Sequence, residues 1–165
     1  MRLEAKVVFT PTDLARRLLQ AEEIVAEEMG AALDDLAGQV ERGAKRKAPK
    51  DRGDLSRKIT IGKPAPAVRT IGANVPQAAP MEYGTRPHWP PVTPIREWVW
   101  RNRAKFGVST RPQAERVAFM VGRAIARRGL KERRYLRASL AQVIQGARET
   151  VMLYARRLVK RVMGS

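Results

Sequence analysis

Apolar residues recur at three-, four- or seven-residue steps through the first fifty residues, which is the period of one face of an α-helix. Thr10 and Pro11 predict where this helix begins, because threonine is a favourable N-cap and proline suits the first helical position. The helix would run to about Ala48, so it would hold roughly 35 residues and extend about 50 Å. A small domain rarely covers so long an apolar face, so part of the helix is expected to pack on another subunit. Gly30, Gly38 and Gly43 would allow a kink, and the face itself consists of Leu14, Leu18, Val25, Met29, Leu33, Leu36 and Val40.

Three short segments have the composition of β-strands. Leu3–Phe9 alternates loosely and ends in β-branched and aromatic residues. Leu55–Ile61 and Ala67–Ala73 predict a hairpin whose connecting turn is Gly62–Pro66. Residues 74–82 are interrupted by proline and are expected to form an irregular turn or one turn of helix.

The second half of the chain predicts further helices. Thr93-Pro94 repeats the start signal of the first helix, and Gly107 would end this second one. Thr110-Arg111-Pro112-Gln113 resembles a capping box and begins a helix that Gly129 would terminate.

A basic connector, residues 133–137, precedes the last helix and contains Tyr135-Leu136 as a candidate short strand. Apolar residues from Leu140 to Val162 then recur at heptad-like spacing. The elements together predict an α+β fold: long N-terminal and C-terminal helices packed on a small antiparallel sheet, with a helical insertion at about 93–129. A length of 165 residues favours one domain spanning residues 1–165.

The formal net charge of +17 is distributed unevenly along the chain. Residues 1–93 hold 15 Lys and Arg against 12 Asp and Glu, whereas residues 94–165 hold 18 against 4. Within the first part, residues 10–41 hold 2 basic and 8 acidic residues. Such polarity indicates either a nucleic-acid surface or an acidic partner surface. In a homo-oligomer, the acidic helix of one subunit could face the basic half of the next.

The densest basic stretch spans a helix end and the connector after it. Phosphates could be neutralised there, in which case DNA affinity would fall steeply with salt. Alternatively the stretch docks on an acidic protein surface, or lines a DNA passage without gripping the DNA. Aromatic residues are too sparse around it for a base-stacking platform. The stretch consists of Arg123, Arg127, Arg128, Lys131, Arg133, Arg134 and Arg137.

Residue types that carry enzymatic chemistry are scarce. The chain has no cysteine and a single histidine, His88, so a zinc site of the usual type would need ligands from several subunits. Carboxylate pairs such as Glu22-Glu23 and Glu27-Glu28 are typical of a solvated or partner-facing helix side, and no glycine-rich phosphate loop occurs. Neither a signal-peptide segment nor a membrane-length apolar run is present. No catalytic residue, metal site, cofactor or membrane association is therefore expected.

Two tryptophans lie close together in the predicted helix after Thr93. Trp98 is expected in the core, and Trp100 on the surface or at an interface. Interfaces are enriched in Trp and Arg, so Trp100 with Arg96 and Arg103 is a candidate contact patch.

Two motifs bracket the predicted hairpin. Ala48-Pro49-Lys50-Asp51-Arg52-Gly53-Asp54-Leu55 is a helix stop followed by a turn. Glu82-Tyr83-Gly84-Thr85-Arg86 leads into a proline-rich segment that holds His88 and Trp89. In this order the motifs resemble those of the head–tail joining (tail completion, or neck) proteins of long-tailed bacteriophages. That family has a helix ending in Ala-Pro, then Asp-x-Gly-x-Leu, a hairpin, and Tyr/Phe-Gly-Thr before a proline-rich loop.

A third motif extends the resemblance to the last helix. Tyr135, Leu136 and Leu140 match the family's aromatic-Leu-x-x-Ala-Leu pattern. The sequence departs from the family at Ala138-Ser139, where a proline is usual, and the helical insertion is longer than in compact members.

The resemblance implies a non-enzymatic virion subunit of the neck or tail, assembled in the host cytoplasm. It implies a homo-oligomeric ring, six-fold in the usual case, around the DNA channel, with other neck and tail proteins as partners and lumenal DNA as a further contact without sequence specificity. Residues 84–93, the arm, would reach neighbouring subunits. The alternative from a different class is a small basic nucleic-acid-binding protein. The residues expected at subunit or partner interfaces are Asp51, Gly53, Leu55, Tyr83, Gly84, Thr85, Arg86, His88, Trp89 and Trp100.

Overall fold

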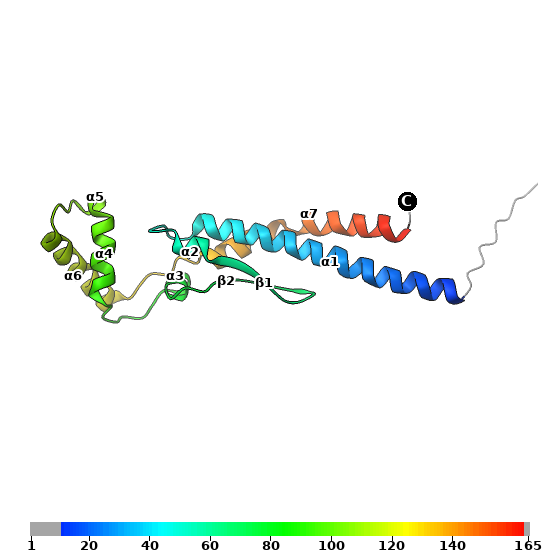
Figure 1. Cartoon of the computed structure of the whole chain (residues 1–165), viewed down its shortest axis with the longest axis horizontal. Helices are drawn as coiled ribbons and strands as arrows, with labels where there is room; N and C mark the ends of the chain where they lie inside the picture. Colours follow the sequence, from blue (N-terminus) through cyan, green and yellow to red (C-terminus); the bar gives the residue numbers. More distant parts are fainter. Residues whose placement is uncertain (1–10, 164–165) are drawn as a thin grey trace, which may run out of the picture. The chain divides into compact units, whose positions relative to one another are not determined.

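The first helix is long and continuous. The computed structural model describes the backbone of residues 11–163 and the side chains of residues 19–162, so the strand expected at Leu3–Phe9 and the N-cap at Thr10 lie outside the described residues. Helix α1 spans Pro11–Lys47, 37 residues, close to the length predicted from its apolar pattern. None of its glycines interrupts it (Figure 1).

A short helix and a hairpin follow α1. Helix α2 spans Asp54–Arg57, strand β1 spans Ile59–Ala65 and strand β2 spans Val68–Ala73. The two strands form a two-stranded sheet. The hairpin prediction is confirmed, but β1 was expected to end at Ile61 and continues through the expected turn to Ala65, and β2 begins at Val68, one residue later than expected. Both strands are edges of this sheet, and an edge tolerates a proline such as Pro64.

The beginning of the predicted first strand is helical instead. Gly53 has a φ of 79°, and its carbonyl accepts a 3.0 Å hydrogen bond from the Arg57 N–H. This left-handed glycine turns the chain into one turn of helix at α2 and directs Leu55 into the interior, where it is 4% exposed. Leu55–Arg57 is therefore not strand, because the glycine sets the local backbone.

The remaining elements are all helices. Helix α3 spans Ala78–Tyr83, α4 spans Val92–Arg101, α5 spans Arg103–Phe106, α6 spans Arg111–Arg128 and α7 spans Tyr135–Met163. Of the two alternatives for residues 74–82, an irregular turn or one turn of helix, the helical one is present, and α3 extends one residue beyond that range. The strand expected at Tyr135-Leu136 was wrong, because these residues form the first turn of α7.

Capping residues and glycines next to the helix ends determine where several helices of the insertion begin and end. Thr110 Oγ1 accepts a hydrogen bond from the Gln113 N–H at 3.4 Å, and Gln113 Oε1 accepts one from the Thr110 N–H at 3.1 Å, so the predicted capping box is present. Gly129 follows the end of α6 as expected. Thr93 was predicted as the N-cap and Pro94 as the first helical residue, whereas α4 begins two residues earlier, at Val92. This helix was also predicted to continue without a break to Gly107. Instead, Asn102 separates α4 from α5. The Asn102 side chain donates a hydrogen bond to the Trp98 carbonyl at 3.0 Å.

Contacts group the chain into two compact units. The first contains α1 up to Gln39, hairpin residues Ile61–Thr70 and α7 from Gln142 onwards. Polar contacts join its parts: Arg161 of α7 pairs with Glu27 and Glu28 of α1, each at 2.8 Å. The long helices therefore lie antiparallel within this unit (Figure 1). No helix among residues 11–163 is long and apolar enough to cross a membrane.

The second unit contains Val40–Thr60 and Ile71–Ala141, and it has two apolar clusters. One forms where the end of α1, α2, β1 and the start of α7 meet, around Ala44, Ala48, Leu55, Ile59 and Tyr135. The other holds the insertion together around Val99, Val108, Ala114 and Ala118. The helix-dominated α+β class is confirmed, and the assignment of residues 1–165 to one domain stays a prediction.

Candidate interaction surface

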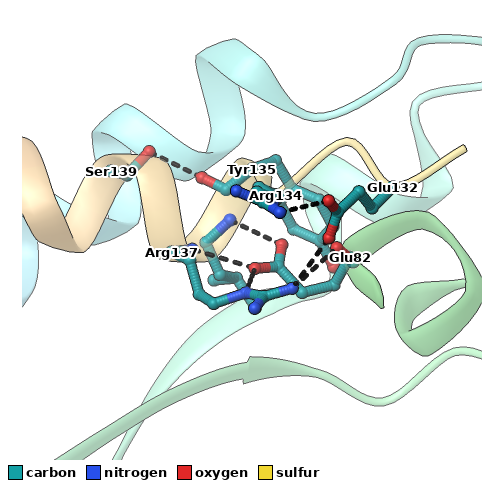
Figure 2. Close-up of polar contacts among 7 residues, drawn as sticks. Glu82, Glu132, Arg134, Tyr135, Arg137 and Ser139 are labelled. Carbon is teal, nitrogen blue, oxygen red and sulfur yellow. Dashed lines mark hydrogen bonds and ion pairs between the residues drawn. The ribbon is translucent and has the colours of Figure 1, made fainter. Parts of the chain in front are cut away.

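Glu82 of α3 is almost fully buried and caps a helix that begins more than fifty residues later. Its side chain is 1% exposed. Glu82 Oε2 accepts a 2.8 Å hydrogen bond from the Leu136 N–H, and Oε1 accepts a 3.0 Å bond from the Arg137 N–H (Figure 2). Unpaired N–H groups in the first turn of a helix are normally satisfied by the side chain just before it. Here the cap for α7 comes from a residue distant in sequence. The motif Glu82–Arg86 therefore helps to stabilise the fold of its own chain through Glu82.

Two glycines allow the chain on either side of the insertion to pair. Thr85 N–H donates to the Leu130 carbonyl at 3.0 Å, and the Leu130 N–H donates to Thr85 Oγ1 at 3.0 Å. Gly84 has a φ of 73°, and a Cβ there would lie 2.5 Å from the Leu130 oxygen. Gly129 has a φ of 71°, and its Cβ would lie 1.9 Å from the Thr85 oxygen. Both positions therefore require glycine, for backbone conformation and for space.

Charged side chains lie at the surface near the hydrogen-bonded pair Thr85 and Leu130. Arg137 Nε lies 3.3 Å from Glu82 Oε1, and Arg137 Nη2 lies 3.4 Å from Glu132 Oε2. The same guanidinium lies over the Tyr83 ring, 4.9 Å from its centroid, while Tyr83 is 65% exposed. Arg134 pairs with Glu132, and this pairing holds the pKa of the Glu132 carboxyl below its usual value (Figure 2). Arg134 and Arg137, expected on a free basic surface, thus have acidic partners in the same chain.

The first and third motifs meet in the apolar cluster around Tyr135. Tyr135 is 1% exposed and packs with Ala48 and Leu55. Its hydroxyl has no hydrogen-bond partner among the described residues, and burial raises the pKa of this phenol. One turn along, Ser139 Oγ donates to the Tyr135 carbonyl at 2.7 Å. A Cβ on Gly43 of α1 would lie 3.2 Å from Ser139, so the two helices approach closely here.

Asp51 ties the turn after α1 to the end of α4. Its carboxylate accepts hydrogen bonds from Arg101 Nη2 at 2.5 Å and from Asn102 Nδ2 at 3.2 Å. The Arg101 guanidinium is the main cause that holds the pKa of Asp51 below its usual value. Asp51 and Gly53, expected at interfaces, therefore both have roles within the chain.

The arm lies partly against α6. The Trp89 and Phe119 rings meet edge to face with centroids 5.6 Å apart, and each side chain is 52% exposed. Pro90 is buried, and a Cβ on Gly122 of α6 would lie 3.8 Å from it. Arg86 and His88 are exposed, and the His88 ring is hydrogen-bonded to the Arg86 carbonyl at 2.9 Å.

Trp100 has contacts within its own chain, and its expected place at an interface stays a prediction. Its ring is partly buried against the insertion's apolar cluster. The guanidinium of Arg103 lies 5.3 Å from its centroid and that of Arg111 lies 4.4 Å away. Arg96, the other expected member of the patch, pairs with Glu97 and Glu115 instead. Trp98 packs edge to face on Phe106 at 5.0 Å, as a partly buried residue of the same cluster.

The remaining basic residues of the predicted stretch are exposed, and none of them forms an ion pair with another described side chain. They are Arg123, Arg127, Arg128, Lys131 and Arg133. The stretch is thus divided into this unpaired group and the paired residues Arg134 and Arg137.

Several exposed residues of α6 were not among the interaction residues predicted from the sequence. Phe119 and Met120 of α6 are 52% and 60% exposed, and Arg116 is exposed one turn before them. The spacing Arg116, Met120, Arg123, Arg127 follows one helix face and was the available signal. Glu82 gave no such signal, because the helix it caps is distant in sequence. Among the residues with described side chains, no group of three or more His, Asp or Glu lies close enough together to bind a metal ion.

Residues 12–84 match the HK97-gp10-like family model, described as "Bacteriophage HK97-gp10, putative tail-component". The match ends at Gly84, where the chain leaves α3 for the arm. The match covers less than half of the chain and confirms the resemblance to phage proteins that the motifs indicate. No curated protein and no solved structure matches the chain significantly.

Proposed function

We propose that this chain, similar over residues 12–84 to a phage tail component, is a non-enzymatic structural subunit of the virion neck. Copies of it would form a ring, six-fold by analogy with such proteins, that joins head to tail around the DNA channel. Assembly would take place in the host cytoplasm. The observation that carries the proposal is the family match, which includes the first of the two motifs that bracket the hairpin and the first three residues of the second, Glu82–Gly84.

The apolar surface of α7 supports an oligomeric role. Seven large apolar side chains on this helix are each 46% to 63% exposed. Exposed apolar side chains gathered on one helix are what a surface covered by a protein partner would present. The seven are Leu140, Ile144, Val151, Met152, Leu153, Val159 and Val162.

Removal of the gene from the encoding phage tests the proposal. We expect filled heads and complete tails to accumulate separately in the lysate, and the full chain supplied from a plasmid to restore joined particles. Reconstruction of intact particles should then place density for the chain at the junction of head and tail. Normal joined particles without the chain would overturn the proposal.

A nucleic-acid-binding protein is the second candidate, favoured by the unpaired residues Arg123, Arg127, Arg128, Lys131 and Arg133. Binding of generic duplex DNA through n phosphates would give a log–log salt slope of about −0.9n. A monomer that binds DNA tightly with such a slope, and is absent from purified particles, would support this second candidate over the first.

A further inference from the structure

Helix α6 has an outward face on which apolar and basic side chains alternate. Phe119 and Met120 are more than half exposed, and Arg116, Arg123 and Arg127 are exposed around them. None of these arginines forms an ion pair with a described side chain. The sequence holds no acidic residue between Arg116 and Lys131. Trp89 adjoins Phe119 and widens the apolar part of this surface, which we call the α6 face.

Helix α1 has a face of the opposite charge. Leu19, Glu22, Ala26 and Met29 follow each other at three- and four-residue steps, so they share one side of the helix. All four are exposed, with Leu19 at 66% and Met29 at 52%, and Glu23 lies beside them. No basic residue occurs between Leu18 and Met29. We call these five residues the α1 face.

The carboxylates of α1 that pair within the chain are Glu27 and Glu28, both with Arg161 of α7. Glu27 lies one turn after Glu23, at the border of the α1 face, and the Glu28 side chain is only 12% exposed. Glu28 follows Glu22 by six residues, which places it well away from the α1 face around the helix. Glu22 and Glu23 form no ion pair with a described side chain, so both carboxylates are available to a partner.

We propose that the α1 face of one copy docks on the α6 face of the next copy. The two faces are complementary in three respects: carboxylates meet guanidinium groups, Leu19 and Met29 meet Phe119 and Met120, and each face extends about 15 Å along its helix. A contact between two different patches is heterologous and closes into a ring when the rotation between copies allows it. The inference deepens the proposed function and rests on it for the ring.

The mixed composition of the α6 face favours a protein occupant over DNA. Phosphate groups would satisfy the arginines but would leave Phe119 and Met120 without an apolar partner. Central apolar anchors with arginine beside them are typical of protein contacts. A second copy of the chain supplies both required chemistries on one helix face.

Charge reversal on each face tests the pairing. Glu22→Arg with Glu23→Arg, or Arg123→Glu with Arg127→Glu, places like charges opposite each other, and we expect the dissociation constant of self-association to rise about tenfold or more. All four substitutions in one chain restore complementary charges and should restore association. An equimolar mixture of the two double variants should also associate, because each supplies a partner for the altered face of the other.

Sedimentation velocity across a dilution series measures these effects, with circular dichroism to show that each variant is folded. Arg42→Glu with Arg46→Glu is the matched control, since it changes the charge as much as the α6 variant does at two exposed residues elsewhere. This control should associate like the unaltered chain.

The possible failures are distinguishable. An unaltered chain that associates while both double variants do so equally well would overturn the pairing of these faces and leave the proposed ring intact. An unaltered chain that stays monomeric throughout the dilution series would overturn the pairing as well. If the α6 variant lost only salt-dependent binding to duplex DNA and kept its association, the α6 face would belong to DNA and the inference would be wrong.

Discussion

Glu82 Oε2 accepts a 2.8 Å hydrogen bond from the backbone N–H of Leu136. The residue that caps α7 therefore belongs to α3, and the Arg137 N–H donates to the other carboxylate oxygen at 3.0 Å. A long-range cap joins the stability of α7 to the position of α3, because neither helix can shift without loss of these bonds.

Glu82→Ala should lower the free energy of unfolding by about 3 kcal/mol, since it leaves buried N–H donors of α7 without acceptors. Glu82→Gln keeps one acceptor but turns an amide N–H₂ towards the second donor, and it should cost about 1–2 kcal/mol. Urea unfolding followed by circular dichroism measures both. Equal stability of the alanine variant and the unaltered chain would contradict the capping role.

Gly129→Ala should be among the most damaging single substitutions in the chain. It places a Cβ 1.9 Å from the Thr85 oxygen on a residue whose φ is 71°. We expect a loss of about 3 kcal/mol or more in the free energy of unfolding. Gly146→Ala is the matched control: it lies in α7 with nothing within 4 Å of the added Cβ. Helix propensity predicts that it gains about 0.5–1 kcal/mol. A similar effect of both substitutions on the thermal midpoint would show that the pairing at Gly129 is wrong.

Tyr135→Phe should leave stability unchanged or raise it by about 1 kcal/mol, because the hydroxyl it removes is buried and has no hydrogen-bond partner in the part of the chain that the structure describes. Tyr135→Ala should lose about 4 kcal/mol, since it empties the centre of an apolar cluster. Thermal unfolding of the two variants separates the contribution of the ring from that of the hydroxyl. A large loss in the phenylalanine variant would mean that the hydroxyl has a partner after all.

The contact between α1 and the hairpin should weaken in acid. Hydrogen bonds from Arg69 at 2.5 Å and Lys63 at 2.8 Å lower the pKa of Asp34 from 3.8 to about 2. The folded form therefore binds this proton less readily than the unfolded chain. The stabilisation is complete above the unfolded pKa and is lost as the pH falls through about 2.

Carbon-detected NMR titration should give Asp34 a midpoint near 2. Asp34→Asn should flatten the acid limb of the unfolding profile between the unfolded and folded pKa values. A midpoint near 3.8 for Asp34 would show that these ion pairs do not persist in solution.

Features that depend on neighbouring residues could be predicted from the sequence. The capping box at Thr110 and Gln113 and the helix end at Gly129 were predicted because each signal lies within one turn of the structure it sets. Tyr135 was expected in a strand because its cap, Glu82, is distant and leaves no pattern next to it. Leu55 was misassigned for a different reason, since the left-handed Gly53 overrides the β-like composition that follows it.

The predicted basic residues likewise include some whose surroundings could be predicted from the sequence and some whose surroundings could not. Arg123 and Arg127 could be found from charge density alone, and they are exposed as expected. Arg134 and Arg137 look identical to them in sequence but are paired, because the fold brings Glu132 and Glu82 beside them.

The hydrogen bonds between Thr85 and Leu130 fasten together the two ends of everything from Arg86 to Gly129. The two ends of this segment therefore lie next to each other, and helices α4, α5 and α6 form an insertion that leaves and rejoins the rest of the chain at one place. A change in the length of the segment between them would therefore leave Thr85 and Leu130 next to each other, as long as these two hydrogen bonds persist.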